Sequence, residues 1–343
     1  MSLATARAVI DEHLGKLFTA CVLATERGGT RELIAAGTLC PDPNGGPDAE
    51  CTARSLFDLA SLTKLATTTL VLSFVRDRVL ELDQPLRELV PDFRGGAKDT
   101  VTLAQVLTHT AGLNWWKPLW KEATSSEEAI WLAAQEPLAR EPGTFVYSDL
   151  GYVMLTQGLA NVGDAPFHDL VRERVLEPIE AECDFLPKET LRCVATEEDT
   201  AWRHKRLRGE VHDENAHAMG GIAGHAGLFG TAADVLALAR VFRDGAVIGN
   251  ELAQEARKEH ARGENARRGL GLALRAPVGP MVGRWFGESA FGHLGFTGTS
   301  LWIDPALGLT VALLTNRVYF GRDNDPDMYR FRIAVHEAVS EPS

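Results

Sequence analysis

Strand-like patterns lie at the two ends of this chain of 343 residues and are almost absent between them. Apolar or alternating runs bounded by turn residues are typical of strands. They occupy residues 20–24 and 32–37 near the N-terminus, and 269–275, 281–286, 299–303 and 309–315 near the C-terminus. Strands need partners, so the two ends of the chain are expected to meet in one sheet. Most of the sequence between them is then an insertion.

Helical patterns fill most of the remaining chain. They cover residues 4–17, 60–79, 150–162, 231–242, 250–260 and 328–339. Between about residues 85 and 198 short helices predominate, and capping-box spacing marks two starts, at 102–105 and 125–128. The predicted class is α+β (mixed α/β), an antiparallel sheet flanked by helices with an inserted all-helical domain. We place the sheet domain at residues 1–80 and 225–343, the insertion at 81–224, and the active site at their junction.

Ser61 and Lys64 stand three residues apart at the start of the first long helical run. Positions i and i+3 share one face of a helix, so the hydroxyl and the amine are expected to be neighbours. A serine becomes a useful nucleophile when a base takes its proton or a neutral lysine is held beside it. Free N–H groups in the first helical turn would stabilise developing negative charge. The same spacing also occurs in helices without chemistry, so other segments must decide its meaning.

The excess of acidic over basic residues limits the kinds of partner that the protein is expected to bind. With 47 acidic and 35 basic residues the formal charge is −12, which disfavours nucleic acid and anionic membrane surfaces. We expect no membrane span and no secretory signal, because no apolar stretch is long enough for either. The five cysteines lack metal-like spacing, which favours reduced thiols and a cytoplasmic location. A small-molecule substrate is the expected partner, and the oligomeric state stays open.

Aromatic residues are dense in one loop of the insertion. Trp115, Trp116 and Trp120 follow the segment His109–Gly112, whose glycine is expected to close a short helix. Such residues either line a pocket or form a small core beneath the loop, and the sequence favours neither.

A Pro-Gly turn later in the insertion leads to Tyr147 and then to Asp149. The aspartate directly precedes the helical pattern at 150–162, where it could serve as an N-cap. The tyrosine could equally be a half-buried aromatic residue.

A glycine-rich stretch at residues 211–227 holds several residue types that bind metals. They are His212, Asp213, Glu214, His217 and His225. The helical His-x-x-x-His spacing is absent, and the glycines disfavour a rigid helix. We therefore expect no metal or other cofactor, and interpret the stretch as a loop that walls an active site.

Three motifs occur in order along the chain: Ser61-Leu-Thr-Lys64, Tyr147-Ser-Asp149 and Gly292-His293-Leu-Gly295-Phe-Thr-Gly298. Together they resemble the signatures of the serine β-lactamase and penicillin-binding protein superfamily. This resemblance extends over nearly the whole chain. The likeness is greatest to its class C-like branch of β-lactamases, esterases and D-amino-acid peptidases. It implies a β-lactamase/transpeptidase-like fold and a serine hydrolase that forms an acyl-enzyme.

The resemblance also implies residue roles. Ser61 would be the nucleophile, with Lys64 or Tyr147 moving its proton, and the sequence leaves open which of the two is the base. Backbone N–H groups of Ser61 and of Phe296, the latter expected on an edge strand, would form the oxyanion hole. The substrate-binding group would further include Asp149, His293, Gly295, Trp115 and Trp116.

Two departures from the family pattern bear on the substrate. His293-Leu294-Gly295 replaces the Lys-Thr-Gly of many β-lactamases, and Asp149 replaces an asparagine. A histidine is mostly neutral at neutral pH, whereas Asp149 would either repel a substrate carboxylate or pair with Lys64. We therefore expect a hydrolase of small esters or amides. The alternative is a penicillin-binding D,D-carboxypeptidase, a D-aminopeptidase or a weak β-lactamase, and a non-catalytic sensor is the third hypothesis.

Overall fold

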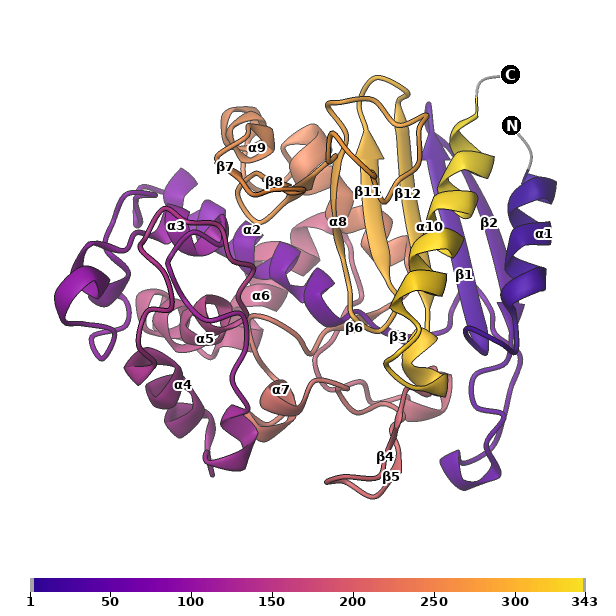
Figure 1. Cartoon of the computed structure of the whole chain (residues 1–343), viewed down its shortest axis with the longest axis horizontal. Coiled ribbons are helices and arrows are strands. Elements are labelled where there is room, and N and C mark those ends of the chain that lie inside the picture. Colours follow the sequence, from indigo (N-terminus) through magenta and orange to yellow (C-terminus); the bar gives the residue numbers. More distant parts are fainter. Residues whose placement is uncertain (1–2, 342–343) are drawn as a thin grey trace.

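A computed structural model describes residues 3–341 and pairs the two ends of the chain in one antiparallel sheet (Figure 1). The strand order is β2-β1-β12-β11-β10-β9-β8-β7. Strand β1 (Ala20–Arg27) lies between its hairpin partner β2 (Thr30–Gly37) and β12 (Leu309–Thr315). The other strands are β11 (Ser300–Asp304), β10 (Phe291–Leu294), β9 (Ala273–Leu274), β8 (Arg267–Arg268) and β7 (Ala261–Arg262). The predicted fold class is confirmed.

Helices cover both faces of this sheet. Along β1, Leu23 packs with α1 (Leu3–His13) and α10 (Asp325–Ser340), which lie side by side on one face. Its neighbour Val22 points to the other face, into the core with α2 (Thr63–Arg76) and α8 (Ala232–Asp244). This alternation follows from the two-residue period of a strand, and it buries β1 and β12 on both faces.

The middle of the chain forms a group of helices beside the sheet, seen at the left of Figure 1. This group consists of α3 (Leu103–Leu107), α4 (Ser126–Gln135), α5 (Leu150–Gly163) and α6 (Phe167–Val171). Two further helices, α7 (Glu214–Ala218) and α9 (Asn250–Arg257), follow later in the chain. Short two-residue strands pair elsewhere, namely β3 (Phe57–Asp58) with β6 (Phe229–Gly230) and β4 (Glu198–Asp199) with β5 (Lys205–Arg206). One buried cluster continues from the sheet through α2 into α5, so the division at residues 81 and 224 stays a prediction.

Local sequence signals explain several boundaries. Thr102 forms the predicted capping box with Gln105 at the start of α3, and Ser125 accepts from the N–H of Glu128 at the start of α4. Thr231 caps α8 in the same way, through Asp234. Among residues 3–341, no helix is both long and apolar enough to cross a bilayer.

Other predicted elements were wrong in extent or type. Residues 281–286 form a loop, in which Val282 and Phe286 are buried in the cluster that includes α10 while Met281 and Trp285 stay exposed. Residues 269–272 are a turn between β8 and β9, and the first helix ends at His13.

Helix α3 ends at Leu107, before the segment His109–Gly112, so Gly112 does not cap it. The predicted helix at 60–79 divides into a 3-10 turn at residues 60–62 and α2, which ends at Arg76.

Candidate active site

Ser61 lies in the 3-10 turn that connects β3 to α2, and its neighbours hold that turn in an unusual shape. Ala60 has φ 46°, a left-handed conformation that costs an alanine about 1 kcal/mol or more. The buried carboxylate of Asp58 compensates by accepting from the Ala60 N–H at 2.8 Å and from the His212 N–H at 2.6 Å. The turn therefore holds Ser61 half-buried just before the first turn of α2.

Lys64 lies in the first turn of α2 with its side chain fully buried. Its Nζ donates to Ser61 Oγ at 2.8 Å and to the His225 carbonyl at 3.1 Å. The same Nζ lies 2.7 Å from Asp149 Oδ1. The predicted adjacency of the serine and the lysine is therefore present, although Ser61 itself precedes the α-helix.

The electrostatics around Lys64 favour its charged form. Burial alone would lower its pKa, but the adjacent Asp149 carboxylate, with a smaller contribution from Tyr147, outweighs burial and raises the pKa of Lys64 above its ordinary value. At neutral pH Lys64 is accordingly an ammonium that donates hydrogen bonds to Ser61 Oγ. This form cannot accept the serine proton.

Tyr147 faces the same group. Lys64 Nζ lies 5.3 Å from the centroid of its ring, and the ring of His109 lies 4.3 Å away on another side. His109 in turn accepts from the N–H of Ser148 through Nδ1 at 3.1 Å, which ties the Tyr147 segment to the end of α3. Burial, then the charges of Arg268 and Lys64, lower the pKa of His109 well below its ordinary value, so it is neutral.

Asp149 occupies the N-cap position of α5, but its side chain does not cap that helix. Ser148 Oγ accepts from the Leu150 N–H instead, at 3.2 Å. The Asp149 carboxylate is thereby free to form the ion pair with Lys64, the second of the two roles expected for it.

The segment after β10 lies against the turn that carries Ser61. Thr297 Oγ1 donates to the Asp58 carbonyl at 2.7 Å, and Thr299 Oγ1 donates to the Leu59 carbonyl at 3.1 Å. A Cβ at Gly295 would lie 2.0 Å from Thr299 Oγ1 and 2.6 Å from the Leu59 carbonyl oxygen, so only glycine permits this approach.

Phe296 lies in this turn and not in a strand, which corrects the expected edge-strand position. Within residues 3–341 its N–H has no hydrogen-bond partner, as an oxyanion donor requires. His293 lies in β10 with its ring buried, and its Nδ1 donates to the Leu294 carbonyl at 2.9 Å. Burial, then the charges of Lys64 and Arg268, lower the pKa of His293 well below its ordinary value. The neutral form of His293 is consistent with the expected lack of a fixed charge.

The tryptophans take different roles. Trp115 is 66% exposed, and its carbonyl accepts from the Asp149 N–H at 3.1 Å, so it adjoins the site. Trp116 is half-buried with its ring 5.8 Å from that of Trp115. Trp120 is half-buried, and its ring centroid lies 4.6 Å from that of Trp202. The ring contact favours the packing alternative for Trp120, whereas a pocket lined by Trp115 and Trp116 stays a prediction.

The glycine-rich stretch contributes hydrogen bonds. His225 Nε2 lies 2.8 Å from Asp213 Oδ1, and His212 Nε2 lies 2.8 Å from Glu197 Oε2. Within the described part of the chain, no three His, Cys, Asp or Glu side chains are grouped as metal ligands. The stretch supplies the His225 carbonyl to Lys64 and also contains the short helix α7.

One residue missed by the sequence reasoning is Arg268 of β8. Its guanidinium carbon lies 5.3 Å from the Tyr147 ring centroid, and its buried Nε has no hydrogen-bond partner in the described part of the chain. No local signal could have identified it, because only the pairing of β8 with β9 brings it beside a tyrosine 121 positions earlier in the chain.

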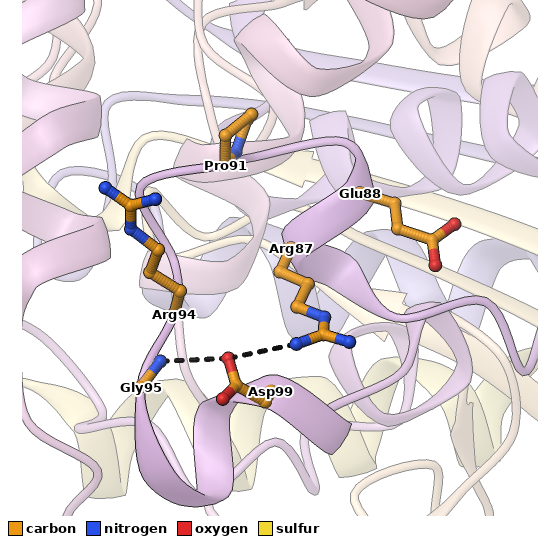
Figure 2. A pocket seen from close by; sticks show the side chains of 6 residues that line it. All are labelled: Arg87, Glu88, Pro91, Arg94, Gly95 and Asp99. Carbon is orange, nitrogen blue, oxygen red and sulfur yellow. Dashed lines mark hydrogen bonds and ion pairs between the residues drawn. The ribbon is translucent and has the colours of Figure 1, made fainter.

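The hollow shown in Figure 2 is separate from these residues. It has a volume of about 720 Å³ and is lined by Arg87, Glu88, Pro91, Arg94, Gly95 and Asp99. Asp99 accepts from the Gly95 N–H and pairs with Arg87, so this hollow is a polar surface of the segment between α2 and α3.

Comparison with known proteins agrees with this geometry. An N-acetylmuramyl-L-alanine amidase of Bacillus subtilis strain 168 is 29% identical over 306 residues, which cover 78% of this chain and 69% of the amidase. The solved structure of EstCE1, a hydrolase with promiscuous acyltransferase activity, shares the fold with a TM-score of 0.80 at 21% identity, covering 97% of this chain and 98% of that one. A class C beta-lactamase from Rhodobacter sphaeroides superposes with a TM-score of 0.77 at 17% identity, covering 98% of both chains. The beta-lactamase family model matches residues 7–335, so this chain belongs to the beta-lactamase family.

Proposed function

We propose that this protein is a serine hydrolase that cleaves a small ester or amide through an acyl-enzyme on Ser61. The observation that carries the proposal is the buried Lys64 ammonium, 2.8 Å from Ser61 Oγ and 2.7 Å from Asp149. A buried charge beside a half-exposed hydroxyl is expensive to maintain, and such arrangements are concentrated at reactive sites.

In the first step, Ser61 Oγ attacks the carbonyl carbon of the substrate and forms a new C–O bond. The carbonyl π electrons move to its oxygen, which the N–H groups of Ser61 and Phe296 stabilise. Because Lys64 is an ammonium, we assign the general base to Tyr147, whose ring lies 5.3 Å from Lys64 Nζ. Tyr147 in its phenolate form takes the serine proton and returns it to the departing alcohol or amine as the old bond breaks, which regenerates the phenolate.

Water then hydrolyses the acyl-enzyme by the reverse sequence. It loses a proton to Tyr147 while its oxygen attacks the acyl carbon, and the proton returns to Ser61 Oγ as that bond breaks. All atoms are accounted for with water as the only co-reactant, so the proposal includes no metal or other cofactor.

The substrate side of the proposal rests on charge. Asp149 is occupied by Lys64, and His293 is neutral, so neither presents a fixed charge to the substrate. This favours a neutral acyl group, and we propose Trp115, Trp116 and Gly295 as walls of the site. The chain's negative charge keeps nucleic acids and anionic membranes out of the proposal.

An amide or peptide substrate is the second candidate. Unlike the first candidate, the enzyme is then specifically a penicillin-binding D,D-carboxypeptidase, a D-aminopeptidase or a weak β-lactamase, and the amidase among the relatives supports cleavage of such amide bonds. A non-catalytic sensor stays the third hypothesis, and a cytoplasmic location stays a prediction.

A substrate panel tests the proposal. The purified protein is given p-nitrophenyl acetate and butyrate, nitrocefin and a D-alanyl-D-alanine peptide, with Ser61→Ala as the matched control. We expect ester turnover that Ser61→Ala abolishes. Faster cleavage of the peptide or of nitrocefin would instead support the second candidate, and equal activity of wild type and Ser61→Ala would refute both.

A further inference from the structure

Arg332 is a buried arginine of α10 with no acidic partner among residues 3–341. Its Nη2 donates to two carbonyl oxygens, Gly295 O at 3.3 Å and Thr299 O at 3.2 Å, and its Nε has no hydrogen-bond partner in the part of the chain that the structure describes. A buried cation that no carboxylate neutralises destabilises a folded protein. The groups that Arg332 contacts therefore indicate what other role it has.

The Gly295 carbonyl that Arg332 contacts belongs to the peptide unit that also contains the Phe296 N–H. The C=O of Gly295 and the N–H of Phe296 are parts of the same peptide bond, and the described chain has no cis peptide. In a trans peptide these two groups point in opposite directions. A cation on the carbonyl oxygen therefore fixes the direction of the Phe296 N–H and withdraws electron density from it, which strengthens the N–H as a donor.

The next peptide is held in a similar way. Arg317 Nε donates to the Phe296 carbonyl at 2.7 Å, and its guanidinium lies 4.6 Å from the centroid of the Phe296 ring. Arg317 differs from Arg332 in having an acidic partner, because its Nη1 lies 2.6 Å from Asp325 Oδ1. Of the two cations behind the turn, only Arg332 bonds the peptide that contains the Phe296 N–H.

The front of the turn faces the nucleophile segment. Thr297 and Thr299 bond the carbonyls of Asp58 and Leu59, so the turn lies between the Ser61 segment on one side and α10 on the other. Helix α10 also packs along the sheet beside β12, a rigid support for Arg332 (Figure 1).

We propose that Arg332 is a positioning residue of the oxyanion hole, orienting and polarising the Gly295–Phe296 peptide from behind. This inference rests on the proposed function, since it concerns the donor that stabilises the oxyanion formed on the Ser61 acylation pathway. Arg332 does not touch the substrate, so it acts on the transition state and leaves ground-state binding unchanged.

The test compares Arg332→Met, Arg332→Lys and the control Arg330→Gln. Arg330 lies on the same helix with its side chain 70% exposed and paired with Asp327, so its loss should change nothing. For Arg332→Met we expect kcat for a p-nitrophenyl ester to fall by about tenfold or more while KM changes by less than threefold. A boronic acid that mimics the tetrahedral intermediate should bind weaker by a similar factor. Arg332→Lys restores a cation and should recover part of the loss.

Thermal unfolding separates positioning from structural support. Methionine replaces an unneutralised cation with an apolar chain of similar length, so the Tm of Arg332→Met should equal or exceed that of wild type. If Arg332→Met does not fold, Arg332→Gln takes its place, and kcat must fall in the order wild type, Lys, Gln.

Two results have different meanings. An active wild type with an equally active Arg332→Met, or a loss of kcat that only tracks a loss of folded protein, would overturn the inference alone. A wild type that neither turns over esters nor forms an adduct at Ser61 would overturn the proposed function and the inference with it.

Discussion

Replacing Asp149 with asparagine tests the ion pair at the centre of the site. The change keeps the shape of the side chain and removes only its charge, leaving the Lys64 ammonium buried 2.7 Å from a neutral group. Two unit charges at 2.7 Å attract by about 6 kcal/mol at an effective dielectric constant of 20. Partial exposure of Asp149, 17%, and the amide oxygen of asparagine both reduce the loss, so we expect Asp149→Asn to lower the unfolding free energy by about 3 kcal/mol.

This loss is measurable by calorimetry. An unfolding entropy of about 2.1 cal/mol/K per residue gives about 0.7 kcal/mol/K for 343 residues, so the Tm should fall by about 4 °C. The matched control is Asp11→Asn, which removes an exposed i,i+4 pair with Arg7 and should cost less than about 0.5 kcal/mol.

The pH dependence follows from the raised pKa of Lys64. A cationic group whose pKa is raised on folding contributes stability that is complete below its unfolded pKa, about 10.4, and is lost as pH rises through the folded pKa. The deficit of Asp149→Asn should therefore be the same at pH 6 and pH 9. A Tm within about 1 °C of wild type, or a deficit no larger than that of Asp11→Asn, would refute the reasoning.

Three further substitutions probe the other parts of the site. Gly295→Ala should lower kcat at least about tenfold, because its Cβ would lie 2.0 Å from Thr299 Oγ1. The control Gly287→Ala, whose Cβ would lie 3.6 Å from its nearest neighbour, should leave kcat unchanged. Equal kcat values for the two variants would contradict the close approach. Tyr147→Phe should lower kcat about 100-fold or more with an unchanged Tm, and a rate within a few-fold of wild type would remove Tyr147 as the base. Trp115→Ala should raise KM for aromatic esters without changing the Tm, since its side chain is 66% exposed; an unchanged KM would exclude it from the substrate wall.

Much of the fold follows from periodicity. The strands at both ends and the helices with cap residues were predictable, because Thr102, Ser125 and Thr231 act through hydrogen bonds within a few residues. The loop at 281–286 was misassigned, because Val282 and Phe286 are buried in the cluster that includes α10, a contact that local sequence cannot reveal.

The site was predictable only where side chains carry the signal. Ser61 and Lys64 are three residues apart, so their contact was predictable from local sequence. Asp149 reaches Lys64 from the start of α5. Arg268, Arg332 and the His225 carbonyl were not predictable, because their positions depend on strand pairing, helix docking and a main-chain atom. The ion pair of Asp149 was one of three open roles, beside a helix cap and repulsion of a substrate carboxylate, and only the geometry at the start of α5 distinguishes them.

The central claim is that Ser61 is a nucleophile activated by its neighbours, and covalent labelling tests it most directly. Wild type, Ser61→Ala and Lys64→Ala are incubated with a fluorophosphonate, and the intact masses and the labelled peptide are measured. We predict one adduct per chain on Ser61 in wild type, none in Ser61→Ala, and much slower labelling of Lys64→Ala because Ser61 loses its 2.8 Å hydrogen bond to Nζ. An unlabelled wild type, or an adduct that persists in Ser61→Ala, would contradict the account.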